Sequence, residues 1–209
     1  MCRLLSRLKM AHPPPPEHTG HAGRPRHSLL PYTIRPACPA DAQHLPALER
    51  DAARAFATIA GLEWLAGGDV LPLAAHRASI ARHTCWVGVD ATGRLLGFIS
   101  ACPYGNDLHI QEMSVALAAQ GHGLGRSLLR TACQAAQALG LERITLTTFA
   151  NIPWNAPFYA SAGFCSVPSN ALDTRLAAVL AQEQTLGFDP ATRCAMQYVL
   201  PRAVQCVSK

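Results

Sequence analysis

One segment, Gln120-Gly121-His122-Gly123-Leu124-Gly125, constrains this chain more than any other, because its three alternate glycines stand where a helical pattern begins. That pattern repeats apolar side chains every three or four residues, at Leu124, Leu128, Ala132, Ala135 and Leu139. Alternate glycines let backbone N–H groups come close to a ligand, and a helix N-terminus adds the positive end of its dipole. The segment therefore predicts an anion site at the start of a helix.

The loop matches neither of two common phosphate-binding motifs. No Gly-Lys-Ser/Thr follows it, so it is not a Walker A loop. Arg126 stands where the third glycine of the dinucleotide fingerprint would fall. By itself, the loop leaves two interpretations open: an anion cradle, or a glycine loop without a ligand.

The chain has 209 residues, which is enough for one domain of ordinary size with appendages. Its 49% hydrophobic and 15% charged residues exclude disorder over the whole length. The longest stretch without Asp, Glu, Lys or Arg, residues 144–172, carries three asparagines and three prolines, which a bilayer-spanning helix would not tolerate together. We expect a globular protein without a membrane partner.

The net charge of +5 is concentrated in residues 1–30, which hold five Lys and Arg residues against Glu17 alone. The run Pro13–Pro16 and four histidines interrupt any periodic pattern there. We expect a flexible, basic, Pro- and His-rich extension, either a disordered tail or a misassigned translation start, followed by the folded domain at residues 31–209. Because the basic excess lies on no patterned face, we expect no nucleic-acid partner.

The eight cysteines are scattered without a CxxC pair, and several stand in apolar contexts where a thiol acts as a small hydrophobe. This usage favours a reducing, cytoplasmic compartment. A zinc site needs two close Cys/His pairs, and the nearest approach is His83 and Cys85, which we expect on one strand. We therefore expect no metal site.

Hydrophobic periodicity from Tyr32 onward predicts strands mixed with helices. The turn composition Asp90-Ala91-Thr92-Gly93 predicts an antiparallel hairpin between the second and third strands. The expected strands are Tyr32–Arg35, Thr84–Val89, Arg94–Cys102, Leu108–Val115, Arg143–Phe149 and Arg193–Leu200. The expected helices are Pro39–Phe56, Leu71–His83, Leu124–Leu139, Trp154–Ala162 and Ala171–Gln184.

The order of strand, glycine loop, helix, strand, asparagine, tyrosine and Gly-Phe resembles the GNAT superfamily of acyl-CoA-dependent N-acetyltransferases, over about Tyr32 to Leu200. The resemblance is carried by Glu112-Met113-Ser114-Val115, Gln120 to Gly125, the string from Asn151 to Tyr159, and Gly163-Phe164. That string looks like a bacterial subgroup of small GNAT enzymes. The resemblance implies an α/β GNAT fold, with a mixed, mostly antiparallel, twisted sheet flanked by helices.

The resemblance also implies a binding site for acetyl-CoA. Its pyrophosphate is expected on the loop, at Gln120, Gly121, His122, Gly123, Leu124, Gly125 and Arg126. Its pantetheine arm is expected to pair like an extra strand with Met113, Ser114 and Val115, where this strand should diverge from its neighbour. The Arg126 side chain either supplements the phosphate contacts or is a solvated first-turn residue, and His122 is expected to be a loop residue without a catalytic role.

The implied chemistry is direct attack of a neutral amine on the acetyl thioester, without an acyl-enzyme, in keeping with the lack of a convincing Cys-His or Ser-His pairing. By resemblance, Tyr159 is the general acid for the CoA sulfur; otherwise it is a packed helix tyrosine. Glu112 is the candidate base, acting through water; otherwise it is an exposed strand glutamate. Backbone amides near Val115 are expected to stabilise the oxyanion.

The chain departs from the family at one position. Where relatives commonly have an asparagine, this sequence has Ile152, with Asn151 and Asn155 on either side. Asn155 is therefore expected either to contact CoA or to cap the short helix. Trp154 either borders the amine pocket or packs against the helix.

The expected function is transfer of an acetyl group from acetyl-CoA, without a metal, to a primary amine of a small molecule. Two alternatives stay open: a protein or peptide amine as acceptor, and a non-catalytic acyl-CoA-binding module. The sequence does not determine the oligomeric state, and a homodimer is compatible with it.

Overall fold

The computed structural model describes residues 31–152 and 154–201, so the expected extension at residues 1–30 lies outside the described part. The described strands form one seven-stranded sheet in the order β1-β2-β3-β4-β5-β7-β6. Its neighbouring strands are antiparallel except for the parallel pair β4 and β5. The strands are β1 (Thr33–Pro36), β2 (Cys85–Val89), β3 (Leu95–Tyr104), β4 (Asp107–Val115), β5 (Arg143–Phe149), β6 (Cys165–Ser166) and β7 (Arg193–Val199).

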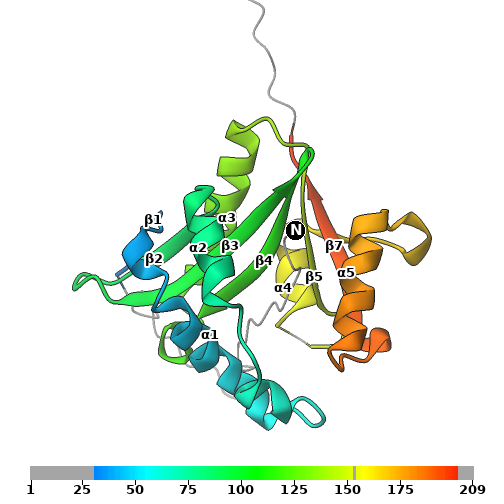
Figure 1. Cartoon of the computed structure of the whole chain (residues 1–209), viewed down its shortest axis with the longest axis horizontal. Helices are drawn as coiled ribbons and strands as arrows, with labels where there is room; N and C mark the ends of the chain where they lie inside the picture. The colour runs from blue at the N-terminus through cyan, green and yellow to red at the C-terminus, as the bar shows by residue number, and fades with distance from the viewer. Residues whose placement is uncertain (1–30, 153, 202–209) are drawn as a thin grey trace, which may run out of the picture.

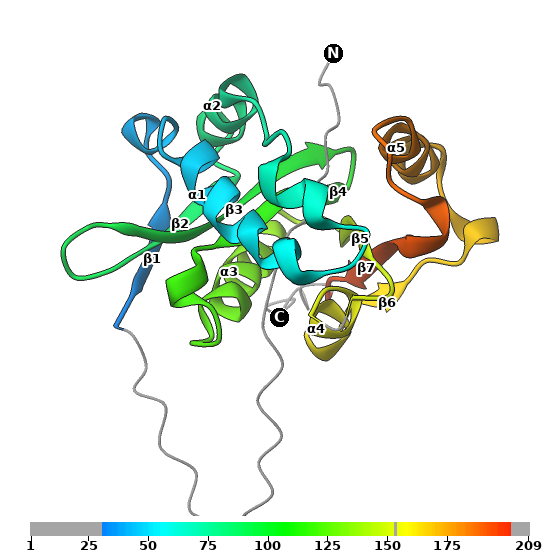
Figure 2. The ribbon, with the colours of Figure 1, turned by 90° about the horizontal axis from the view of Figure 1, so that it is seen from below.

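Helices cover both faces of this sheet. Helices α1, α2 and α5 lie on one face and α3 and α4 on the other, as Figure 2 shows. The α-helices are α1 (Leu45–Ala53), α2 (Leu73–Ala81), α3 (Leu124–Ala138), α4 (Ala156–Ser161) and α5 (Thr174–Thr185). The predicted fold class, a mixed and mostly antiparallel sheet flanked by helices, is confirmed.

The main core lies between the sheet and α3. The buried stripe of α3, including Leu128, Ala132 and Ala136, packs against β-strand side chains such as Ile110 and Ile144. A second core packs α1 and α2 against β2 and β3 on the opposite face. Among the described residues, no helix is long and apolar enough to cross a membrane.

The helix expected at Pro39–Phe56 is divided. A short 3-10 helix at Pro39–Asp41 comes first, because the Asp41 carboxylate accepts a hydrogen bond of 2.7 Å from the backbone N–H of Cys38 and closes a tight turn. Helix α1 then begins at Leu45, with Pro46 in its first turn, where proline is tolerated.

The structure differs from the sequence expectations at three other places. His83 and Cys85 do not share a strand, because His83 lies in a turn after α2, with a φ of 58°, and β2 begins only at Cys85. The edge strand β6 was not expected, since two residues are too short to show a period. Helix α5 also begins later than expected, at Thr174, because the Asp173 side chain caps it.

Candidate active site

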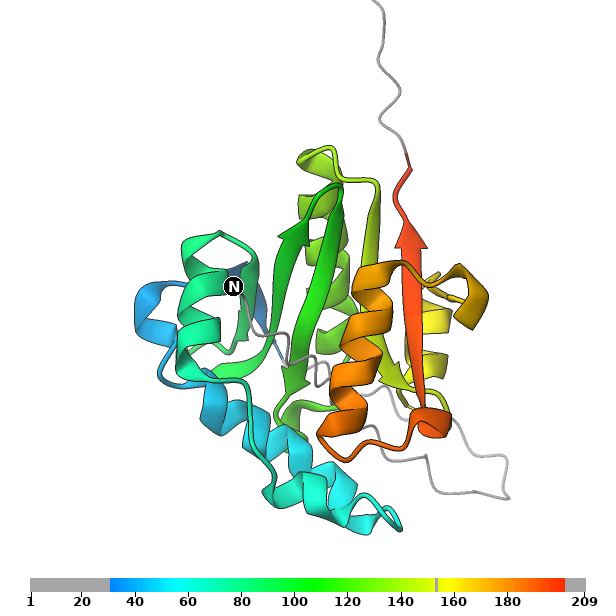
Figure 3. The same ribbon diagram turned by 45° about the vertical axis from the view of Figure 1, so that its right-hand side comes forward.

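Strands β4 and β5 are hydrogen-bonded at one end only. Their pairing covers Asp107–His109 on β4 and Arg143–Thr145 on β5. On their other edges, β4 pairs with β3 and β5 pairs with β7 over many more residues. Figures 1 and 3 show the two ribbons side by side at this end and apart at the other. The divergence predicted at Met113 and Val115 is confirmed, and it leaves a strand edge that an extended ligand can pair with.

A β-bulge lies where the two strands begin to diverge. Ser100 faces Glu112 across the β3–β4 ladder, but the next residue, Ala101, faces Ile110, so Gln111 is an extra residue on β4. Bulges bend the strand and increase its twist. The bulge also changes the face on which later side chains lie. Ile110 before the bulge and Met113 after it both pack in the α3 core. Because neighbouring side chains in a strand alternate between faces, Glu112 lies on the face opposite to Met113.

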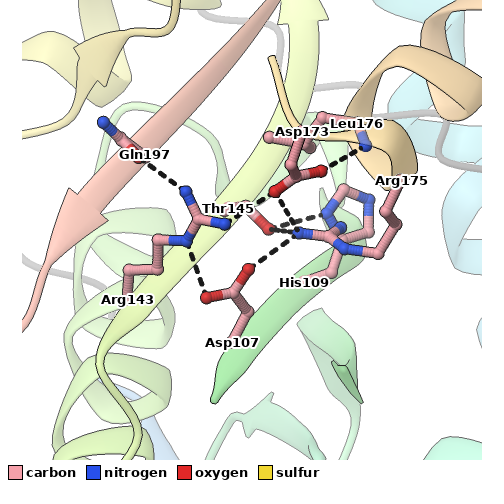
Figure 4. A network of polar contacts seen from close by, with 8 residues as sticks. All are labelled: Asp107, His109, Arg143, Thr145, Asp173, Arg175, Leu176 and Gln197. Carbon is pink, nitrogen blue, oxygen red and sulfur yellow. Dashed lines mark hydrogen bonds and ion pairs between the residues drawn. The ribbon is translucent and has the colours of Figure 1, made fainter. Parts of the chain in front are cut away.

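A polar network fastens the paired end, as Figure 4 shows. The Asp107 carboxylate accepts hydrogen bonds from Arg143 at 2.7 Å and from Arg175 on α5 at 3.0 Å. Arg143 also donates to Asp173 at 2.6 Å, and Arg175 donates to Thr145 at 3.1 Å. Because these bonds join α5 to the starts of β4 and β5, the divergence is confined to the other end of the strands.

The glycine loop turns its backbone toward solvent directly before α3. Gly121 and Gly123 have φ values of 80° and 82°, in the left-handed region that favours glycine. Gly123 is the N-cap of α3, and no side chain caps the helix there. The first-turn N–H groups of Leu124, Gly125 and Arg126 therefore have no intrahelical acceptor, which is the geometry of an anion site.

Three contacts hold this loop against the sheet. The Gln120 side chain donates to the Val115 carbonyl at 3.0 Å, and the hydroxyl of Tyr32 lies 3.0 Å from that of Ser127 in the first turn of α3. The Leu124 side chain is buried in the core, so only its backbone is available to a ligand. Tyr32 was not singled out in the sequence, since no local pattern marks its contact with α3.

Leu124 fits closely over two facing strand glycines that the sequence analysis missed. Gly88 on β2 pairs with Gly97 on β3. A Cβ atom added to Gly88 would lie 2.5 Å from the Leu124 side chain, and one added to Gly97 would lie 2.9 Å from the Ser114 carbonyl oxygen. These glycines therefore let the start of α3 approach the sheet. An unexplained glycine within each predicted strand is the signal that marks them.

Glu112 is fully buried, so the alternative of an exposed strand glutamate is wrong. The hydroxyl of Ser114 donates to its carboxylate at 2.8 Å. The two side chains share a face of β4, because residues two apart in a strand point the same way. Ser114 thus contacts the candidate base through its side chain, while its predicted backbone contact with pantetheine stays a prediction, as do those of Met113 and Val115.

Tyr159 on α4 is fully buried, and its hydroxyl has no hydrogen-bond partner within the described chain. Burial raises the pKa of this phenol well above its ordinary value, and the nearby Glu112 carboxylate raises it further, while Arg193 opposes the shift. The ring packs edge-on against Phe164, with centroids 5.7 Å apart. Tyr159 is therefore a packed tyrosine whose phenol stays protonated, and its role as general acid stays a prediction.

Asn155 occupies the N-cap position of α4, but its side chain does not cap the helix. Both polar atoms of its amide are buried without a partner among the described residues. Buried amides normally find partners, so this group is suited to a bound ligand. Of the two alternatives, side-chain capping is wrong, and CoA contact stays a prediction.

The Arg126 side chain is exposed but anchored. It donates to the Ser161 hydroxyl at 2.8 Å and to the Ser161 carbonyl at 3.2 Å, and its guanidinium lies 6.0 Å from the Phe158 ring centre. It therefore links the start of α3 to the end of α4, beyond the two roles expected from the sequence. His122 lies half-buried in the loop, where it was expected.

A pocket of about 370 Å³ lies beyond the end of β5. It is bounded by the segment between α1 and α2, by the residues after Phe149, and by the connection between α5 and β7. Trp154 packs against the same apolar cluster as Phe149, which supports its packing interpretation. The pocket adjoins the helix that carries Tyr159, because Ile152 in its wall accepts a hydrogen bond of 3.0 Å from the Asn155 backbone.

A family model described as "Acetyltransferase (GNAT) family" matches residues 49–164, more than half of the chain. The chain belongs to this family. The match covers the second half of α1, the diverging strands, the glycine loop and α4, and it ends at Phe164. This GNAT acetyltransferase also shares its fold with many solved structures.

Three of these structures illustrate the range of acetyltransferases that share this fold. The N-acetylglutamate synthase from Neisseria gonorrhoeae, complexed with coenzyme A and N-acetyl-glutamate, is 19% identical with a TM-score of 0.56; the match covers 82% of this chain but only 35% of that one. The PaiA N-acetyltransferase from Thermoplasma acidophilum, complexed with coenzyme A, is 16% identical (TM-score 0.58; 81% and 99% covered). The ribosomal-protein-S18-alanine N-acetyltransferase from Escherichia coli is 13% identical (TM-score 0.54; 85% and 99% covered). At these identities the likeness establishes the fold.

Proposed function

We propose that this GNAT protein transfers the acetyl group of acetyl-CoA directly to a primary amine of a small molecule. The observation that carries the proposal is the divergence of β4 from β5, with Glu112 buried on β4 and a Tyr159 hydroxyl that has no hydrogen-bond partner among the described residues. One proton acceptor and one proton donor are what direct acyl transfer to an amine requires.

The residues present fit acetyl-CoA as co-substrate. The first-turn amides of α3 and the left-handed glycines Gly121 and Gly123 would hold the pyrophosphate. The unpaired edge of β4 near Met113 and Val115 would pair with the pantetheine arm. Solved structures of the same fold contain coenzyme A, including those from Neisseria gonorrhoeae and Thermoplasma acidophilum, which supports this assignment.

Each predicted catalytic residue then has one task. Glu112 takes a proton from the alkylammonium, through a water molecule, so that a neutral amine attacks the thioester carbon. The C–N bond forms, the C–S bond breaks, and Tyr159 gives its proton to the departing thiolate. The second proton of the attacking nitrogen, which the amide product cannot keep, returns to the Tyr159 phenolate and restores the phenol. Backbone amides near Val115 stabilise the oxyanion between these steps. No covalent acyl-enzyme is formed.

The pocket beyond β5 supports a small acceptor over a protein one. Its volume of about 370 Å³ lies at the lower end of the range for small-molecule sites, which is roughly 300–1,000 Å³. A protein substrate would more often need an extended groove for several residues of its chain.

Thermal unfolding with and without acetyl-CoA, followed by a screen of amines for thiol release, tests the proposal. At 100 times its dissociation constant, acetyl-CoA should stabilise the fold by about 2.7 kcal/mol. A melting curve that neither acetyl-CoA nor desulfo-CoA shifts would contradict the co-substrate assignment. A shift without thiol release for any amine or peptide would instead identify a non-catalytic acyl-CoA-binding module.

A further inference from the structure

The walls of the pocket beyond β5 are mostly apolar and partly aromatic. Residues from three segments that lie far apart in the sequence supply these side chains: Ile59, Leu62, Trp64, Phe149, Ile152 and Phe188. The Trp64 and Phe188 rings meet edge-on with centroids 5.2 Å apart, and Phe149 and Phe188 lie 5.7 Å apart. Such a lining binds the body of a ligand through burial of its apolar surface.

The aromatic walls are held from behind by a buried ion pair. The Arg193 guanidinium lies 4.4 Å from the centre of the Phe149 ring and 5.0 Å from that of Phe188. Arg193 also donates to both carboxylate oxygens of Glu183, at 2.8 and 2.9 Å. Because Glu183 balances its charge, Arg193 fixes the two rings without making this wall cationic.

The charge on the lining is acidic. Asp189 contributes a carboxylate, and none of the described residues that line the pocket is basic. Asn151 and Thr192 add neutral polar groups. An acceptor that carries its own carboxylate would be repelled by Asp189. Its carboxylate would also lose its hydration on entering the pocket, and no cation in the lining would compensate for that loss.

The pocket is placed to deliver an amine to the predicted catalytic residues. Phe149 is the last residue of β5, at the open end of the divergence from β4. On the other side, Ile152 is joined to α4 through the hydrogen bonds from Asn155 to Ile152 and from Tyr159 to Asn155, at 3.0 and 3.2 Å. A body held in the pocket thus lies beside the helix that presents Tyr159.

We propose that the acceptor is a primary amine carried on an uncharged aromatic body without a carboxylate, of the 2-phenylethylamine class. This inference rests on the proposed function and names its acceptor. The apolar walls select the ring, and the Asp189 carboxylate in the lining disfavours an acceptor that carries a carboxylate of its own.

Four amines test the inference by separating size from charge. They are 2-phenylethylamine, L-phenylalanine amide, L-phenylalanine and 1,4-diaminobutane, each assayed for thiol release from acetyl-CoA. The first should exceed both L-phenylalanine and 1,4-diaminobutane in kcat/KM by more than about 100-fold. L-Phenylalanine amide, which has the same ring and no carboxylate, should be clearly better than L-phenylalanine. Equal or higher kcat/KM for L-phenylalanine or 1,4-diaminobutane would overturn the inference.

Calorimetry measures the binding of 2-phenylethylamine in the presence of desulfo-CoA, without turnover. It therefore tests the acceptor inference separately from the proposed function. If acetyl-CoA does not stabilise the protein, the proposed function fails, whatever the amines do. If acetyl-CoA binds but no amine is turned over, calorimetric binding of 2-phenylethylamine still supports the pocket assignment, and its absence overturns it.

Leu62→Arg gives the sharpest variant, because it places a cation in the apolar wall at a half-buried position that can accept a long side chain. It should lower kcat/KM for 2-phenylethylamine by about 10-fold or more and raise it for L-phenylalanine. Leu139→Arg is the matched control, since Leu139 lies outside the lining and is 69% exposed. If both variants keep the parent's order of preference, the pocket does not choose the acceptor.

Discussion

The hydroxyl of Tyr159 lies within electrostatic reach of the Glu112 carboxylate, although the two residues come from α4 and β4. After burial, this carboxylate is the strongest influence that raises the pKa of Tyr159. The phenol therefore stays protonated at neutral pH and can donate, while the Glu112 side chain lies on the face of β4 away from α3. This pairing suits a reaction that removes one proton and supplies another.

Tyr159→Phe should lower kcat by about 10²–10⁴-fold while acetyl-CoA binding persists, because the variant keeps the packed ring and loses only the proton donor. Stability should hold or rise slightly, since the deleted hydroxyl has no partner among the described residues. Steady-state kinetics and thermal shifts measure both. Tyr198→Phe, which changes a half-buried tyrosine on β7, is the control and should keep full activity. Activity of Tyr159→Phe within twofold of the parent would exclude the residue as general acid.

Glu112→Gln should lower kcat/KM at pH 7 by about 10²-fold or more, because an amide cannot take the proton of an alkylammonium with a pKa near 10. The fold should survive, since the Ser114 hydroxyl can donate to the amide oxygen as it does to the carboxylate. The deficit should shrink as pH rises and more amine arrives neutral. A pH profile parallel to the parent's, like that of the exposed control Glu142→Gln, would show that Glu112 is not the base.

Gly123→Val should remove the stabilisation by acetyl-CoA, because a side chain on the loop would block the approach of the pyrophosphate to the amides. The change also strains a backbone with φ of 82°, at a cost of about 1–2 kcal/mol in unfolding free energy. Gly93→Val controls for this cost, since Gly93 has φ of 84° in the β2–β3 turn. Both variants should melt earlier, and Gly93→Val alone should respond to acetyl-CoA. A normal response of Gly123→Val would place the phosphates elsewhere.

Two buried histidines should make the fold less stable in acid. Burial lowers the pKa of His76 to about 4, and burial together with Arg175 lowers that of His109 to about 3, against about 6.5 in an unfolded chain. Below pH 6.5 the unfolded chain binds protons that the folded chain does not, so stability falls as pH drops from 6.5 toward 4.

Urea unfolding across this pH range measures the effect. His109→Gln removes one group that takes up a proton on unfolding. The variant should therefore reduce the slope of unfolding free energy against pH by about 1.4 kcal/mol per pH unit, whatever its effect on stability at pH 7. The exposed-site variant Gln134→Ala on α3 should keep the parent's slope. An unchanged slope for His109→Gln would mean that this imidazole is protonated in the folded protein.

The sequence by itself determined the local elements of this protein. Apart from the divided helix at Pro39–Phe56 and the unexpected strand β6, the predicted strands and helices agree with the observed ones to within a few residues, because periodicity and turn residues act over short stretches of chain. Gly121 and Gly123 marked the loop because a left-handed backbone favours glycine in any context. The family's motif residues added Glu112 and Tyr159 as candidates, but not their surroundings.

Only the tertiary structure decided how those candidates are arranged. A strict alternation along β4 would put Glu112 on the same face as Leu108 and Ile110, in the α3 core; the bulge at Gln111 moves it to the other face. The contact of Arg126 with Ser161 and the assembly of the acceptor pocket likewise join segments far apart in the chain. Local patterns cannot encode such contacts, because strand register and helix packing fix them only when the whole sheet has formed.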